Sequence, residues 1–180
     1  MSYITYQGKM IQTNHKYLID SITYNDWFLP SIDALNAMLI ELHDHSVGNF
    51  VEDYYWSSSE YSITHAYLQI FWTGFPISQS SKGGVNHVRA CRTFISTTNY
   101  NLRDIGPAGG WIFWKSGNNY LECAPADQSN VSEWSNIVDQ EIGTTGIAIG
   151  TGQTNTTAII NQDGHINSAA KLCADLIIMK

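Results

Sequence analysis

The sequence predicts an α+β fold, because one clear helical pattern is surrounded by short segments with the alternation of strands. Hydrophobic residues make up 43% of the 180 positions and aromatic residues 12%, which is enough for a packed core. Charged residues are only 14%, and most of the remaining polar residues are the uncharged Ser, Thr, Asn and Gln. This composition favours a strand- and loop-rich protein that works outside a cytosol.

Residues 1–20 are predicted to form a short β arm. Residues 3–6 and 9–12 are strand-like and flank Gln7-Gly8, where glycine permits a positive φ. Two short strands are too small to hold a core of their own. We therefore expect residues 1–20 to anchor a main domain of residues 21–180.

The strongest helical pattern follows Pro30. Ser31 is a suitable N-cap, and the apolar residues after it recur at helical spacing: Ile32, Leu35, Met38, Leu39 and Leu42. Gly48 is expected to close the element. Further on, strands are expected at residues 54–56, 66–72 and 88–94, with a polar turn at 57–60 and a loop at 78–86.

The second half begins with a turn at residues 105–110. Strands are expected at residues 111–114 and 120–124, joined by a hairpin loop, and residues 125–153 are expected to be mostly loop. Thr154 or Asn155 is expected to cap a short helix that ends at Ile160, and Ser168 a last helix.

Charge and hydropathy exclude two classes of partner. Nine Lys+Arg against sixteen Asp+Glu give a net charge of -7, which argues against nucleic-acid binding. No apolar run reaches about 18 residues, so no membrane span is expected. The first residues lack the pattern of a secretory signal, so we expect another route to the outside, such as a virus particle.

Catalysis and metal binding find little support. Ser57, Ser59, Glu60 and His65 lack the elbow motif of a hydrolase, and no enzyme activity or cofactor is expected. The three cysteines, Cys91, Cys123 and Cys173, are expected to be buried thiols, with a Cys123–Cys173 disulfide as the alternative. A calcium site is a second alternative, formed from the acidic residues Asp127, Glu133, Asp139, Glu141 and Asp163.

Two groups of motifs carry a family resemblance. The first group is Asp26-Trp27-Phe28-Leu29-Pro30-Ser31, Tyr55-Trp56-Ser57-Ser58-Ser59-Glu60-Tyr61 and Val88-Arg89-Ala90-Cys91-Arg92. The second group is Asp104-Ile105-Gly106-Pro107-Ala108-Gly109-Gly110, Asp127-Gln128-Ser129 and Glu133-Trp134. Together they resemble the C-terminal domain family of bacterial collagen-like adhesins, over about residues 24–94 and 103–176. The resemblance implies a C-type-lectin-like fold.

The two motif groups stand in inverted order relative to that family. The halves, residues 21–98 and 99–180, are therefore expected to form a circular permutant that closes on itself, with residue 24 close to Lys180. The alternative is a swapped oligomer in which each half pairs with a neighbouring chain.

That family is similar to the variable proteins of diversity-generating retroelements, in which a fixed scaffold presents interchangeable residues. The resemblance implies ligand binding by Ser62, Ile63, Thr64, His65, Tyr67, Gln69, Phe71, Thr73, Phe75, Ile77 and Gln79. It implies a scaffold of Trp27, Trp56, Ser58, Glu60, Arg89 and Arg92, with an Arg–Glu pair pinning the loops. Alternate residues from Tyr67 to Gln79 share one strand face, and their aromatic and small polar mixture suits recognition. The alternative for Phe71, Trp72 and Phe75 is an ordinary place in the core.

The sequence therefore predicts a non-enzymatic recognition module on a phage virion surface, as a fibre or decoration protein that binds a host-surface protein or glycan. Residues 1–20 would contact other virion proteins, and a homo-oligomer is expected. Two alternatives stay open: a purely structural virion subunit, and a domain of a secreted or cell-surface bacterial adhesin.

Overall fold

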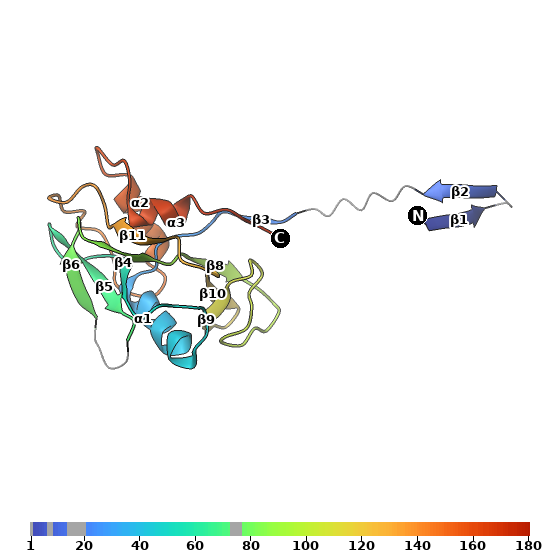
Figure 1. Cartoon of the computed structure of the whole chain (residues 1–180), viewed down its shortest axis with the longest axis horizontal. Helices are drawn as coiled ribbons and strands as arrows, with labels where there is room; N and C mark the ends of the chain where they lie inside the picture. Colours follow the sequence, from blue (N-terminus) through green and yellow to red (C-terminus); the bar gives the residue numbers. More distant parts are fainter. Residues whose placement is uncertain (1, 7–8, 14–20, 73–76) are drawn as a thin grey trace.

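The computed structural model describes residues 2–6, 9–13, 21–72 and 77–180. At the N-terminus, β1 (Ser2–Tyr6) and β2 (Lys9–Thr13) form an antiparallel pair in which Ile4 lies opposite Ile11. Figure 1 shows this hairpin and the ribbon of the main body. The two strands expected between residues 3 and 12 are thus confirmed, while Gln7-Gly8 falls outside the described residues.

The centre of the body is a five-stranded sheet in the order β11-β7-β4-β5-β6. Its pairs are antiparallel except for a parallel bridge between β4 and β7. The strands are β4 (Tyr54–Glu60), β5 (His65–Ile70), β6 (Ser78–Ser81), β7 (Val85–Val88) and β11 (Ser129–Glu133).

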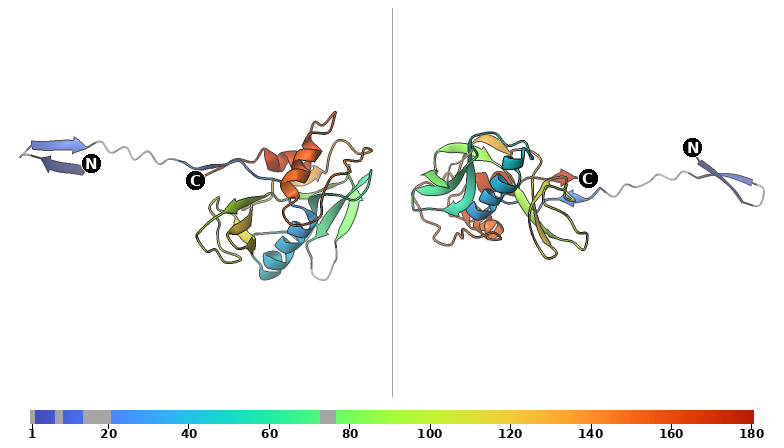
Figure 2. Two further views of the ribbon diagram at one scale, coloured as in Figure 1. Left: turned by 180° about the vertical axis from the view of Figure 1, so that it is seen from behind. Right: turned by 90° about the horizontal axis from the view of Figure 1, so that it is seen from below.

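Helices lie on both sides of this sheet, and the left view of Figure 2 shows α1 in blue apart from α2 and α3 in orange and red. On one side is α1 (Ile32–Glu41), followed by the short 3-10 helix η1 (His43–His45). On the other side are α2 (Gly152–Ile160) and α3 (Ala169–Ala174). Both faces of the sheet are therefore largely buried, which explains why the strands do not show a simple polar–apolar alternation.

Two apolar clusters fill the layers. The first surrounds Trp27, Trp56 and Trp134 and includes Leu68 from β5 and Ile159 from α2. The second packs the buried face of α1 against the opposite face of the sheet, and its members include Leu35, Met38, Tyr55 and Phe71. Each cluster buries large side chains completely, so burial of apolar surface holds the layers together.

A smaller sheet has the order β8-β10-β9 and contains β8 (Cys91–Ile95), β9 (Trp111–Ser116) and β10 (Asn119–Cys123). A bridge between Phe28 and Cys91 connects this sheet to the segment that enters α1. The expected hairpin between β9 and β10 is present, with Gly117 at a positive φ of 57° in its turn.

The first and last segments of the body pair with each other. β3 (Thr23–Tyr24) is antiparallel to β12 (Ile178–Met179), with Ile178 opposite Tyr24. Ile22 N donates to Lys180 O at 2.8 Å, and Lys180 N donates to Ile22 O at 3.0 Å. The expected closeness of residue 24 and Lys180 within one chain is found, and we call this two-stranded unit the closing ribbon.

Two of the three expected N-caps are present, and the one expected at Thr154 or Asn155 is not, because both residues lie inside α2. The side chains of Ser31 and Ser168 accept hydrogen bonds from Ala34 N and Lys171 N at the starts of α1 and α3. Other boundaries differ from the prediction. The first helix ends at Glu41, before Gly48, and α2 begins at Gly152, before Thr154. The predicted α+β class is confirmed, whereas the lectin-like assignment stays a prediction.

Three stretches that the sequence suggested were turn or loop contain strands. Residues 57–60 belong to β4, and Ser57, Ser58 and Ser59 are fully buried. Their hydroxyls bond to other parts of the protein, which lets polar residues occupy an interior strand. β11 lies within the expected loop of residues 125–153, because it pairs with β7 and completes the sheet. β6 and the start of β7 lie within the expected loop of residues 78–86, because they pair with β5 and β11.

Candidate functional site

Six of the predicted ligand-binding residues lie at or near one end of the central sheet, where β4 turns into β5 and β6 runs alongside. Each is exposed or half-buried: Ser62, Ile63, Thr64, His65, Tyr67 and Gln79. Ile77 is exposed as well, but it lies toward the opposite end of β5 and β6, because Ser78 pairs with Leu68 and Ser81 pairs with His65. Tyr67 and Gln79 are direct partners across β5 and β6, so their side chains share one face. Thr73 and Phe75 lie outside the described residues.

Two predicted ligand-binding residues are buried, and their assignment to an exposed face is wrong. Gln69 is 1% exposed and Phe71 is 0% exposed. The reason is α1, which covers the inner part of that sheet face and packs against Phe71. The same strand face emerges from beneath the helix only toward Tyr67 and His65.

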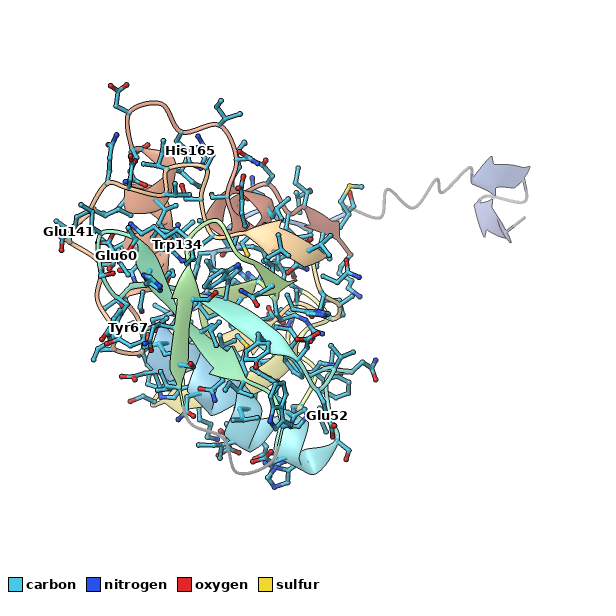
Figure 3. The ribbon with its side chains drawn as sticks, turned by 60° about the vertical axis from the view of Figure 1, so that its left-hand side comes forward. Glu52, Glu60, Tyr67, Trp134, Glu141 and His165 are labelled. Carbon is cyan, nitrogen blue, oxygen red and sulfur yellow. The ribbon has the colours of Figure 1, made fainter. Side chains whose placement is uncertain are left out.

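Tyr61, which sequence analysis did not assign to ligand binding, completes this surface. Its side chain is 52% exposed, and its ring meets that of Tyr67 edge-on at 5.1 Å between centroids. Ile63 is 50% exposed beside it. We define the recognition turn as residues 61–67 together with Gln79, which lies opposite Tyr67. In Figure 3, Tyr67 lies at one edge of the body, away from Glu52.

Local hydrogen bonds hold the recognition turn in shape. His65 O accepts from both Tyr61 N and Ser62 N at 3.0 Å. His65 N donates in return to Ser62 Oγ at 3.2 Å, and Thr64 Oγ1 contacts His65 Nδ1 at 2.9 Å. A partner would therefore meet a largely preformed surface, which lowers the entropy cost of binding.

Below the recognition turn, the buried serines bond to neighbouring elements. The pairing of β4 with β5 shifts register between Trp56 and Glu60, which creates a bulge at these serines. Ser57 Oγ donates to Tyr67 O at 2.8 Å, and Ser59 Oγ donates to Gly146 O at 2.8 Å. Asn155 Nδ2 donates to Ser58 Oγ at 3.1 Å, which supports the scaffold assignment of Ser58.

Glu60 pairs with Lys82 and not with an arginine, which corrects the expected Arg–Glu pair at this position. Lys82 Nζ lies 2.6 Å from Glu60 Oε1 and also donates to Gln140 O at 2.7 Å. The Glu60 carboxylate accepts from Ile142 N and Gly143 N as well. This pair therefore attaches the segment around residue 140 to the base of the recognition turn, as Figure 3 shows for Glu60 and Glu141.

Arg92 does form an Arg–Glu pair, but its partner is Glu122, which the sequence analysis did not name. Its guanidinium contacts Glu122 at 2.7 Å and Asp26 at 2.6 Å. Burial alone would lower the pKa of Arg92, but hydrogen bonds to the two carboxylates outweigh it and the pKa is raised. Burial raises the pKa of Glu122 despite the hydrogen bond from Arg92.

Arg89 joins several loops. Its side chain is 1% exposed and donates to Asp127 Oδ1 at 2.6 Å and to Gly48 O at 2.8 Å. Asp127 Oδ2 also accepts from Tyr55 OH at 3.0 Å and lies 3.1 Å from His87 Nδ1. Burial raises the pKa of the Tyr55 phenol well above its ordinary value. These contacts indicate that Arg89 stabilises the fold by holding the segments around Gly48 and Asp127 together.

Both scaffold tryptophans are buried and bonded. Trp56 Nε1 donates to Ser132 O at 2.9 Å, and Trp27 Nε1 donates to Tyr24 O at 3.2 Å. Trp134, which was outside the predicted scaffold set, donates from Nε1 to Ser57 O at 2.7 Å. The Trp134 indole therefore links the apolar cluster to the buried serines at the base of the recognition turn.

Comparison with known proteins returns no relative. No family model matches the chain, and no curated protein or solved structure matches it either. The functional interpretation therefore depends on the geometry of the recognition turn and on the chemistry of its side chains.

Metal-binding geometry is not found in the described part of the chain, which contains no group of three or more His, Cys, Asp or Glu residues placed to hold an ion. Of the acidic residues suggested for calcium, Asp127 already serves Arg89, and Glu133 accepts from Asn167 Nδ2 at 2.7 Å. All three cysteines are buried free thiols, so the alternative Cys123–Cys173 disulfide is not formed. Among the helices that the structure describes, none is long and apolar enough to span a bilayer.

Proposed function

We propose that this chain is a non-enzymatic recognition module with a C-type-lectin-like fold, and that the recognition turn binds a host-surface protein or glycan. The observation that carries the proposal is the group formed by the exposed Tyr61 and Ile63 and the half-buried Tyr67, held above a base of buried, hydrogen-bonded serines. Aromatic side chains on a rigid base give large contact area at little entropy cost. Display on a phage virion is the setting that we propose for it, since the composition favours work outside a cytosol.

Binding to a printed glycan array and to a panel of intact bacterial cells tests this proposal. Tyr61→Ala and Tyr67→Ala are expected to weaken binding at least tenfold each, because each removes one of the two aromatic rings that meet edge-on in the recognition turn. Val131→Ala is the matched control, since Val131 is 68% exposed on β11 and outside the recognition turn. Equal binding by all three variants would contradict the assignment.

A structural virion subunit is the second candidate, and one observation favours it. The closing ribbon and its flanks expose Ile22, Ile177 and Met179, with exposed fractions of 58%, 61% and 69%. Large apolar side chains on a short two-stranded unit suit contact with another copy of the chain. Light scattering of the purified protein separates the candidates: a stable oligomer that Met179→Lys and Ile177→Lys dissociate favours the subunit, and a monomer that binds favours the module.

A further inference from the structure

A second concave site lies away from the recognition turn, between α1, β9 and the segment of residues 99–103. The groove has a volume of about 580 Å³, which is within the range of small-molecule sites. Its apolar lining includes Ala37, Phe113 and Ile149, with the indole of Trp114 beside them. The groove shares no residue with the recognition turn, so ligand binding in one does not require ligand binding in the other.

The outer wall of the groove is fixed in place. Lys115 Nζ donates to Tyr100 O at 2.8 Å, and Arg103 Nη1 donates to Glu41 Oε2 at 2.9 Å. Arg103 has a positive φ of 73°, an uncommon conformation for a residue with a side chain, and its backbone N–H donates to Ile112 O at 2.7 Å. The wall is therefore tied at both ends, to the strand and to the helix, before any ligand arrives.

Two polar side chains of the groove have no partner among the described residues. Asp33 and Asn36 are one helical turn apart on α1, both half-buried, and neither side chain makes a hydrogen bond or ion pair within that part of the chain. The carboxylate of Asp33 is an acceptor, and the amide of Asn36 is both donor and acceptor. They sit next to apolar surface where a ligand would exclude water.

The charges around the groove cancel. Glu41 is neutralised by Arg103, and the negative charge of Asp33 is offset by the positive charge of Lys115, which also lines the groove. An anionic ligand would meet the Asp33 carboxylate, and a purely apolar ligand would bury Asp33 and Asn36 without partners, at a cost of about 1–3 kcal/mol for each group. A neutral ligand with an apolar face and several hydroxyl groups avoids both penalties.

We propose that this groove binds a neutral saccharide. One face of a sugar ring carries C–H groups that pack against the Trp114 indole and the apolar lining. Its hydroxyls donate to Asp33 and exchange hydrogen bonds with Asn36, which satisfies the two groups that have no partner.

Saturation-transfer NMR on the full chain tests the inference with four probes: lactose, maltotriose, the N-acetylglucosamine trimer and the anionic sialyllactose. At least one neutral probe is expected to bind at millimolar concentration. Asn36→Ala and Trp114→Ala are expected to weaken that binding about tenfold or more, since each removes about one hydrogen bond or one packed ring. Tyr67→Ala, a variant of the recognition turn, is expected to leave it unchanged.

Three outcomes would overturn the inference. These are no binding by any neutral probe, preference for sialyllactose over lactose, and binding that Tyr67→Ala abolishes while Asn36→Ala does not. The last outcome would place the sugar on the recognition turn and would leave the proposed function standing. Asn36→Ala and Asp33→Asn alter half-buried side chains on the outer side of α1, so they keep the test valid if Trp114→Ala fails to fold.

Discussion

Lys82 and Glu60 form an ion pair that is almost entirely removed from water. Their side chains are 0% and 5% exposed, and Nζ lies 2.6 Å from Oε1. Lys82 Nζ also lies 5.0 Å from the centre of the Trp134 ring. Because desolvating two charges is costly, the pair is held by the other bonds around it, from Gln140 O and from the backbone of Ile142 and Gly143.

Lys82→Met is expected to lower the free energy of unfolding by about 3–5 kcal/mol, because it leaves the Glu60 charge buried without its cation. Urea denaturation followed by tryptophan fluorescence measures the change. Lys171→Met is the matched control: Lys171 pairs with Asp175 on an exposed helix surface, and its loss is expected to cost less than about 0.5 kcal/mol. A similar loss in the free energy of unfolding for the two variants would show that the buried pair matters no more to stability than an exposed one.

Arg89→Lys is expected to destabilise the protein by about 2–4 kcal/mol, although it keeps the charge. The ammonium group cannot reach Asp127, Gly48 O and Ala124 O together, as the guanidinium does. Thermal unfolding followed by circular dichroism measures the effect. Arg103→Lys is the comparison, because the Arg103 side chain is 37% exposed; an equal shift in Tm would argue against the geometric explanation.

The sequence predicted the parts of the fold that depend on local rules. Ser31 and Ser168 occupy caps because their side chains bond within three residues of their own position. The apolar spacing of Leu35 and Met38 predicted the buried face of α1, because helical periodicity is a local property. The β9–β10 hairpin followed from its glycine turn in the same way.

The features that depend on distant contacts were missed. Residues 57–59 look like a polar turn, and only partners such as Gly146 and Asn155, almost a hundred residues away, make them interior. The alternation that suggested an exposed face at Gln69 and Phe71 was correct as a strand pattern, but it carried no information on where α1 would lie. Likewise, nothing local pairs Glu60 with Lys82, 22 residues later in the chain.

Ser168→Ala and Ser31→Ala are each expected to cost about 1 kcal/mol, since each removes the side-chain acceptor of an N-cap. The measurement is the midpoint of chemical denaturation. Thr154→Ala serves as the control, because Thr154 lies inside α2 and not at a cap, contrary to the sequence prediction. If Thr154→Ala proves as costly as Ser168→Ala, the cap assignments lose their support.

Stability is expected to rise with pH as His165 loses its proton. Burial and the charge of Lys171 lower the pKa of His165 below its ordinary 6.5. Between the two pKa values the unfolded chain binds more protons than the folded chain, so stability increases across this window and the penalty is complete below it. His165→Gln is expected to flatten the difference between pH 5 and pH 7, and Lys171→Met to reduce it. A slope that both variants leave untouched would point to another group.

The three thiols are expected to resist modification in the folded protein. Burial raises the pKa of all three, that of Cys123 to about 11, and each side chain is fully buried. Treatment with a thiol-reactive chromogenic disulfide is expected to label none of them in buffer and all three in denaturant. Rapid labelling of any thiol in buffer would show that its part of the core opens readily.

The closing ribbon also fixes the direction in which the body points. Since residue 22 and residue 180 are hydrogen-bonded to each other, the two strands of the ribbon leave the body at the same place, while β5 and β6 lie toward the other end in Figure 1. A partner attached at either strand of the closing ribbon would therefore hold the domain at the end opposite the recognition turn, which contains Tyr61 and Tyr67. Tension on both strands at once would load the Ile22 and Lys180 hydrogen bonds first, so this joint sets the mechanical weak point of the domain.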